Sequence, residues 1–119
     1  MRVILADDQP DVRSAIRLIL EERPGIEVIS EVSKSGDLLR EIRRCCPDVI
    51  FLDWELPGIG SEELVPLLRA LCPRLSVIAL SSSPQVKQAA LRAGVHEFIC
   101  KSDPPESFLI AVHHCHEEK

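Results

Sequence analysis

The chain has 119 residues, of which 45% are hydrophobic, and carries a formal net charge of −5 at neutral pH. This length suits one compact domain with its own core, and the composition excludes a disordered or collagen-like chain. Because no basic stripe is available to neutralise phosphates, we expect no direct binding of nucleic acid by this domain.

Five short apolar segments alternate with segments of helical spacing. They predict strands at about 2–7, 26–32, 48–53, 75–81 and 96–100. Strands that alternate with helices form βαβ units, and these units build a parallel sheet covered on both faces. We therefore predict a single α/β domain over residues 1–119, with a doubly wound five-stranded parallel sheet and five helices in a (βα)5 order.

The segments between the strands carry the signals of amphipathic helices. In the first of them, the spacing predicts one apolar face toward the core, made of Val12, Ala15, Ile16, Ile19 and Leu20. Pro10 suits the first turn of this helix. Ser83 and Pro84 predict the start of the fourth helix, and Gly94 predicts its end.

Four of the predicted strands end in a polar residue suited to handling phosphate and a metal ion. The first is followed by Asp7 and Asp8, and the third, fourth and fifth lead to Asp53, Ser81 and Lys101. The carboxyl ends of parallel strands share one edge of the sheet, where open α/β sheets place their ligands. We therefore expect three carboxylates, a hydroxyl and an ammonium group to meet there.

These residue types suit phosphoryl transfer assisted by a divalent cation. Neighbouring carboxylates repel one another unless a cation offsets their charge. Asp7, Asp8 and Asp53 offer the oxygen ligands that Mg²⁺ prefers, while Lys101 and Ser81 can contact phosphoryl oxygens. Asp53 follows a central strand, between the acidic pair and the lysine, so it is our candidate for a nucleophile that forms an acyl phosphate.

The same residues resemble, in order and spacing, the receiver domain of bacterial response regulators. The resemblance rests on Asp7-Asp8, Asp53 followed by Leu56-Pro57-Gly58, Ser81, and Phe98-Ile99-Cys100-Lys101. It covers the whole chain and implies a flavodoxin/CheY-like fold. The stretch from Lys101 to Glu106 looks most like the NarL/LuxR-type transcriptional regulators, whose receiver precedes a helix-turn-helix domain.

The resemblance implies a role for each matching residue. Asp53 would accept a phosphoryl group from a sensor histidine kinase, and Ser81 and Lys101 would bind the phosphoryl oxygens. The Mg²⁺ ligands would be Asp53, Asp8, Asp7 through water and the backbone carbonyl of Glu55. Such a domain is a signalling phospho-acceptor that assists its own phosphorylation and dephosphorylation, and not a metabolic enzyme.

The resemblance also implies a conformational switch. Ser81 and Phe98 would move on phosphorylation and change the surface formed by the fourth helix, fifth strand and fifth helix. A homodimer would form in the phosphorylated state. Transcription would be regulated through a DNA-binding domain outside this chain. Phe98 fits an ordinary core position equally well.

Two other functions stay open at this point. A receiver-like protein-binding module that is never phosphorylated fits the same fold. The bulky Trp54 beside the acceptor, and Gly60-Ser61 where the family commonly has Asp-Gly, leave room for that reading. A small phosphohydrolase with an aspartyl nucleophile needs a D-x-D pair, and Asp53-Trp54-Glu55 is only a near match.

The cysteines and the apolar runs bear on the compartment. The chain has five cysteines, an odd number, without a C-x-x-C pair: Cys45, Cys46, Cys72, Cys100 and Cys115. Most lie in apolar stretches, so we expect reduced thiols. No apolar run approaches the roughly 20 residues that span a bilayer, and the start of the chain lacks a secretory signal pattern. We expect a cytoplasmic protein without a membrane contact.

Overall fold

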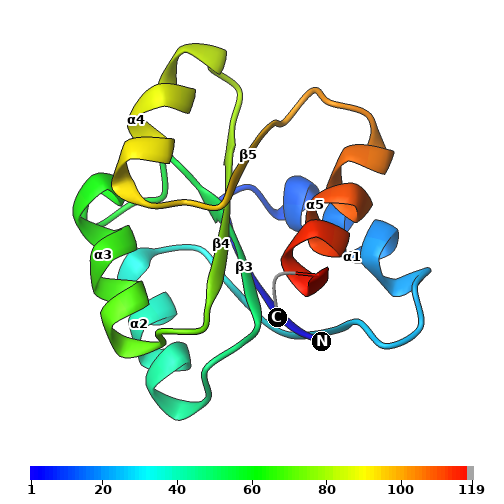
Figure 1. Cartoon of the computed structure of the whole chain (residues 1–119), viewed down its shortest axis with the longest axis horizontal. Helices are drawn as coiled ribbons and strands as arrows, with labels where there is room; N and C mark the ends of the chain where they lie inside the picture. The colour runs from blue at the N-terminus through cyan, green and yellow to red at the C-terminus, as the bar shows by residue number, and fades with distance from the viewer. Residues whose placement is uncertain (118–119) are drawn as a thin grey trace.

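A computed structural model describes residues 1–117, and one parallel sheet of five strands forms its centre (Figure 1). The strands are β1 (Arg2–Ala6), β2 (Glu27–Val32), β3 (Val49–Asp53), β4 (Ser76–Ser81) and β5 (Glu97–Cys100). Each begins and ends within about one residue of the predicted range. Their order across the sheet is β2-β1-β3-β4-β5.

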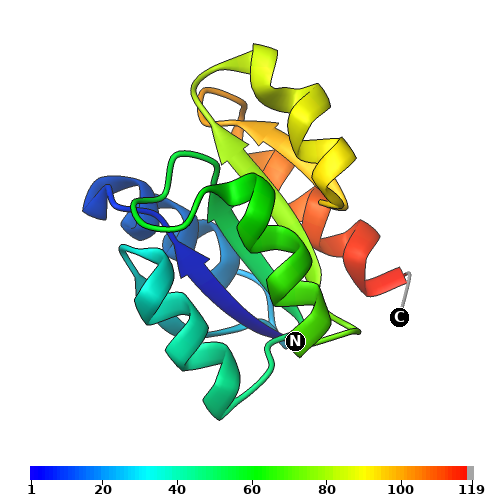
Figure 2. The same ribbon diagram turned by 90° about the vertical axis from the view of Figure 1, so that its left-hand side faces the viewer.

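The helices lie in two layers on opposite faces of the sheet (Figures 1 and 2). One layer holds α2 (Ser35–Arg44), α3 (Ser61–Leu71) and α4 (Lys87–Ala93), the last preceded by a 3₁₀ turn (Pro84–Val86). The other layer holds α1 (Pro10–Glu21) and α5 (Pro105–Glu117). The prediction of a doubly wound parallel sheet with five helices is therefore confirmed.

Each face of the sheet has its own hydrophobic core because successive strand residues point to opposite faces. In β3, Ile50 and Leu52 belong to the core under α2, α3 and α4, whereas Val49 and Phe51 belong to the core under α1 and α5. All of these residues are fully buried. The near-continuous apolar character of β1, β3 and β4 reflects this burial on both sides.

The strand order places the candidate site. Within the sheet, β2 pairs with one edge of β1, and β3 pairs with the other edge of β1. The direction in which strands are added thus reverses at β1. The loops after β1 and β3 therefore diverge to opposite faces of the sheet, and the carboxyl edge at such a divergence is where open α/β sheets place their ligands. Asp7 and Asp8 follow β1 at this edge, and Asp53 is the last residue of β3.

A disulfide between Cys46 and Cys72 lies at the opposite, amino edge of the sheet. It joins the segment before β3 to the residue after α3, across 26 positions of sequence. The expectation of reduced thiols is thus wrong for this pair, since two cysteines without a motif spacing meet only when the fold is complete. The three other cysteines, Cys45, Cys100 and Cys115, lie outside this disulfide.

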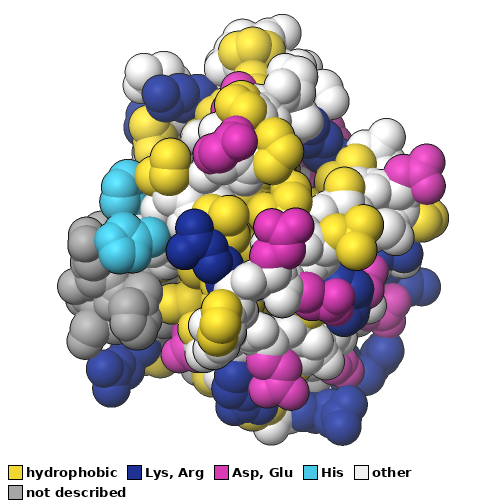
Figure 3. Space-filling view, turned by 90° about the vertical axis from the view of Figure 1, so that its right-hand side faces the viewer, with side chains coloured by type: hydrophobic (Ala, Val, Ile, Leu, Met, Phe, Trp, Pro, Cys, Tyr) yellow, Lys and Arg dark blue, Asp and Glu magenta, His cyan; other side chains and the backbone are white. Residues whose placement is uncertain are grey.

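The face formed by α1 and α5 exposes apolar side chains among charged ones (Figure 3). Leu18 on α1 and Ile110 on α5 are the most exposed large hydrophobic residues, at 67% and 53%. Such side chains are accessible for contact with another protein. Within residues 1–117, no helix has the length and apolar character needed to cross a bilayer.

Candidate functional site

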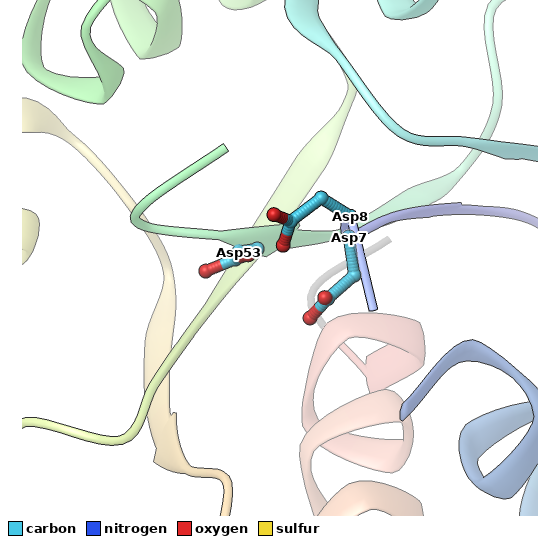
Figure 4. A group of neighbouring side chains, drawn as sticks. All are labelled: Asp7, Asp8 and Asp53. Carbon is cyan, nitrogen blue, oxygen red and sulfur yellow. The ribbon is translucent and has the colours of Figure 1, made fainter. Parts of the chain in front are cut away.

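Three carboxylates lie close together at the carboxyl edge of β1 and β3 (Figure 4). One oxygen each from Asp7, Asp8 and Asp53 lies within 4.8 Å of the others. Asp7 and Asp53 are buried, at 1% and 2% exposure, whereas Asp8 is exposed. The predicted convergence of the acidic residues is confirmed, and its exposed side is the one that carries Asp8.

The position of Asp53 is fixed by hydrogen bonds at the end of β3. Its Oδ1 accepts a hydrogen bond from the Glu55 amide at 3.0 Å, and its backbone carbonyl accepts one from the Leu56 amide at 3.0 Å. The Trp54 amide donates to the Leu80 carbonyl of β4 at 2.7 Å. The second oxygen of Asp53 remains directed toward Lys101.

Lys101 supplies the positive charge of the site. It follows β5, and its amide donates to the Ser81 carbonyl at 2.9 Å. Its Nζ lies 2.9 Å from Asp7 Oδ2 and 3.5 Å from Asp53 Oδ2. It also donates to Gln9 Oε1 at 2.9 Å. Sequence reasoning missed Gln9, because no spacing marks the residue before a helix as a partner of a lysine 92 positions away.

Burial and neighbouring acids shift the ionisation of the site. Burial, together with the negative charge of Asp7 and contact with Asp8, raises the pKa of Asp53 to about 6, against the opposing effects of the Glu55 amide and Lys101. Burial lowers the pKa of Lys101, but its contacts with Asp7 and Asp53 outweigh this and raise the pKa above its ordinary value. The site therefore holds an unfavourable excess of negative charge that a further cation would relieve.

The donors present fit a divalent cation of the Mg²⁺ kind. Hard cations take carboxylate oxygens and keep waters or phosphate oxygens as further ligands. The three clustered carboxylates supply such oxygens, and the excess of negative charge favours a cation beside them. The exposed position of Asp8 leaves that side of the cluster open to solvent ligands.

Ser81 has a partner that the sequence did not reveal. Ser81 is fully buried and is the last residue of β4. Its Oγ donates a hydrogen bond to the Glu55 carboxylate, whose two oxygens lie 3.0 and 3.2 Å away. The Ser83 amide donates to the same Oγ at 3.0 Å. Sequence reasoning assigned only the backbone carbonyl of Glu55 to the site, because the direction of its side chain cannot be read from spacing.

The loop after Asp53 is held against α2. The Ser35 Oγ accepts a hydrogen bond from the Ile59 amide at 2.8 Å, and the Ser35 amide donates to the Pro57 carbonyl at 2.9 Å. Gly58 has φ +113°, and a Cβ at this position would lie 2.1 Å from Ser35 Oγ. Glycine is required here both for the left-handed backbone and for the close approach.

The two aromatic residues near the site pack on the same face of the sheet. Trp54 and Phe98 are partly buried and contact the core under α2, α3 and α4. Phe98 lies in register with Ala79 of β4. This position agrees with a core residue, and the switch role of Phe98 stays a prediction.

The comparison with known families identifies the chain. The model of the response regulator receiver domain matches residues 3–113. This chain is a response regulator receiver domain. Its relatives include the nitrate/nitrite response regulator NarL of Escherichia coli, 29% identical over 93% of this chain and 52% of NarL. The receiver domain thus spans about half the length of this relative.

Further relatives place the receiver domain among the NarL/LuxR-type regulators. BvgA of Bordetella pertussis, named as a regulator of virulence-factor transcription, is 31% identical over 86% of this chain and 49% of BvgA. The isolated receiver domain of RcsB from Salmonella enterica, solved with beryllofluoride, matches with a TM-score of 0.91, 27% identity, and coverage of 100% and 90% of the two chains. The receiver domain of NarL from Mycobacterium tuberculosis gives a TM-score of 0.89 at 25% identity, with coverage of 99% and 97%.

Proposed function

We propose that Asp53 is the phospho-acceptor of this receiver domain and that Mg²⁺ assists the transfer. The observation that supports this most strongly is the position of Asp53. Its carboxylate lies at the carboxyl edge of the sheet, 3.5 Å from the Lys101 ammonium and within 4.8 Å of two further carboxylates. The residues proposed as nucleophile, cation and metal ligands thus lie close to one another, which supports these roles.

The transfer is an in-line displacement at phosphorus. An Asp53 carboxylate oxygen attacks, and an O–P bond forms as the bond between phosphorus and the donor's leaving group breaks. With a phosphohistidine donor on a sensor kinase, the released imidazole nitrogen takes up a proton. The product is an acyl phosphate on Asp53.

The other site residues stabilise the charge that arrives with the phosphoryl group. Lys101 and Ser81 would each donate a hydrogen bond to a phosphoryl oxygen. Mg²⁺, when bound, would supply positive charge that offsets the negative charge of the carboxylates and of the phosphoryl group. Asp8 and Asp53 would bind it directly, Asp7 through water, and Glu55 through its backbone carbonyl.

The proposal extends to the partners of the domain. A sensor histidine kinase would supply the phosphoryl group, and the surface of α4, β5 and α5, with Phe98, would change in response. The phosphorylated domain would form a homodimer and regulate transcription through a helix-turn-helix domain outside this chain. The RcsB structure bound to a promoter and the half-length coverage of NarL support this, and a protein that acts on chromosomal DNA would reside in the cytoplasm.

Intact-mass measurement tests the acceptor. The purified protein is incubated with Mg²⁺ and a small acyl-phosphate donor. We expect one added phosphoryl group, which Asp53→Asn abolishes and the matched control Asp11→Asn retains, because Asp11 is an exposed acid in the first turn of α1. Absence of an adduct at saturating donor would refute the proposal and favour a protein-binding module that is never phosphorylated.

A further inference from the structure

The Ser81 hydroxyl donates its only proton to a carboxylate that phosphoryl transfer does not require. The acceptor is the Glu55 side chain, with its two oxygens 3.0 and 3.2 Å from Ser81 Oγ. A hydroxyl has a single proton to donate. While this hydrogen bond lasts, Ser81 is therefore unavailable to any other acceptor.

We propose that Glu55 is a positioning residue that holds the Ser81 hydroxyl in the unphosphorylated domain and releases it to the phosphoryl group on Asp53. The inference rests on the proposed function, in which Ser81 donates to a phosphoryl oxygen. Two acceptors then compete for one donor. The strength of the Glu55 hydrogen bond consequently sets how readily the phosphorylated arrangement forms.

The charge of the phosphoryl group favours this release. The Glu55 amide donates to Asp53 Oδ1 at 3.0 Å, so Glu55 lies directly beside the acceptor. A phosphoryl group brings close to two negative charges to Asp53, and it repels a neighbouring carboxylate. The same group offers Ser81 a strong acceptor and drives the Glu55 carboxylate away.

The surroundings of Glu55 allow its side chain to move alone. Glu55 is exposed, so its carboxylate can turn into water, whereas Ser81 is fully buried. The backbone next to Glu55 is fixed, since the Trp54 amide donates to the Leu80 carbonyl and Ser61 Oγ donates to the Trp54 carbonyl, both at 2.7 Å. Release therefore begins with the rotation of one exposed side chain, after which the Ser81 hydroxyl can turn to the phosphoryl group.

The test compares beryllofluoride binding, with Mg²⁺ saturating, by isothermal titration calorimetry. Beryllofluoride occupies the place of the phosphoryl group, so its affinity reports the competition. We expect Glu55→Ala to bind it about tenfold more tightly than the wild type, because a hydrogen bond to a charged group is lost from the free state only. Glu55→Gln keeps an uncharged acceptor and should lie between the two.

A second background separates the hydrogen bond from the loss of one negative charge. In Ser81→Ala there is no hydroxyl to release, so Glu55→Ala should change the affinity for beryllofluoride less than twofold. This small remaining change would come from the loss of one negative charge near Asp53. Glu62→Ala, which removes an exposed acid from the first turn of α3, should leave the affinity unchanged.

The outcomes distinguish the two proposals. Equal gains from Glu55→Ala in the Ser81 and Ser81→Ala backgrounds would overturn the role of Glu55 while leaving the phospho-acceptor in place. A weaker affinity of Glu55→Ala in the wild-type background would overturn it as well. If the wild type itself fails to bind beryllofluoride, the proposed function fails, and the role of Glu55 fails with it.

Discussion

The two ends of β3 and β4 have opposite effects on the stability of the fold. At the carboxyl edge these strands lead into buried Asp53 and Ser81, with a second buried acid, Asp7, beside them. At the amino edge the segments that precede the same strands are joined by the Cys46–Cys72 disulfide. One edge holds charges that oppose folding, and the other holds a covalent link that favours it.

The contrast shows how a small domain can tolerate an unfavourable site. Burial raises the pKa of Asp53 to about 6, so its ionised form is disfavoured in the folded state. A covalent link at the far end of the same strands limits the unfolded chain without touching the reactive groups. We infer that the disulfide at the amino edge stabilises the domain, while the reactive groups lie at the carboxyl edge of the same sheet.

The largest expected effect is at the amino edge. Cys46→Ser opens a loop whose closing residues are 26 apart, and the chain-entropy relation for such a loop gives a loss of about 3 to 4 kcal/mol in the free energy of unfolding. Urea denaturation without reductant measures it. Cys45→Ser removes a neighbouring free thiol and should lose less than about 1 kcal/mol. Equal free energies of unfolding of the two variants would show that the disulfide does not stabilise the domain.

The second effect is at the carboxyl edge and has the opposite sign. The folded state raises the pKa of Asp53 from 3.8 to about 6, so between these pH values it binds more protons than the unfolded chain. The free energy of unfolding therefore falls as the pH rises through this interval. At pH 7 without Mg²⁺, Asp53→Asn should be more stable than the wild type by about 3 kcal/mol.

Denaturation of both proteins at several pH values checks the sign. The advantage of Asp53→Asn should disappear below pH 3.8, where the wild-type carboxyl is protonated in both states. Added Mg²⁺ should narrow the difference at pH 7, because the ion binds the folded wild type preferentially. If Asp53→Asn is less stable than the wild type at pH 7, the ionised Asp53 carboxylate does not destabilise the folded domain.

The positions of the strands and of the residues at their ends could be predicted from the sequence, whereas the side-chain contacts could not. The convergence of Asp7, Asp53 and Lys101 followed from strand ends, because parallel strands share one carboxyl edge. The hydrogen bond between Glu55 and Ser81 depends on side-chain rotamers, which spacing does not fix. The cysteine pair was missed for a related reason, since its members become neighbours only through the tertiary fold.

The third prediction removes the cation of the carboxyl edge. Lys101→Ala should slow phosphorylation of Asp53 by a small-molecule donor about 100-fold, since one charged donor to the developing phosphoryl charge is lost. Intact-mass measurement of samples quenched at successive times gives the rate of phosphorylation. Lys87→Ala removes an exposed lysine at the start of α4 and should leave the rate within twofold. A wild-type rate in Lys101→Ala would exclude contact of Lys101 with the phosphoryl group.

The smallest expected effect concerns the loop that carries the site into α3. Gly58→Ala places a methyl group 2.1 Å from Ser35 Oγ and demands a left-handed backbone of an L residue. We expect a loss of about 1 to 2 kcal/mol in the free energy of unfolding. Combined with Ser35→Ala, the steric part of the penalty should fall while the backbone part stays. A neutral Gly58→Ala would show that the loop is not held as described.

The position of the acyl phosphate shows directly whether Asp53 is the phospho-acceptor. The protein is phosphorylated with Mg²⁺ and a small donor, reduced with borohydride, digested and sequenced by mass spectrometry, since an acyl phosphate of aspartate is reduced to homoserine. We expect homoserine at position 53 and intact aspartates at positions 7 and 8. Homoserine at either of those two positions, or phosphate retained on Ser81, would contradict this expectation.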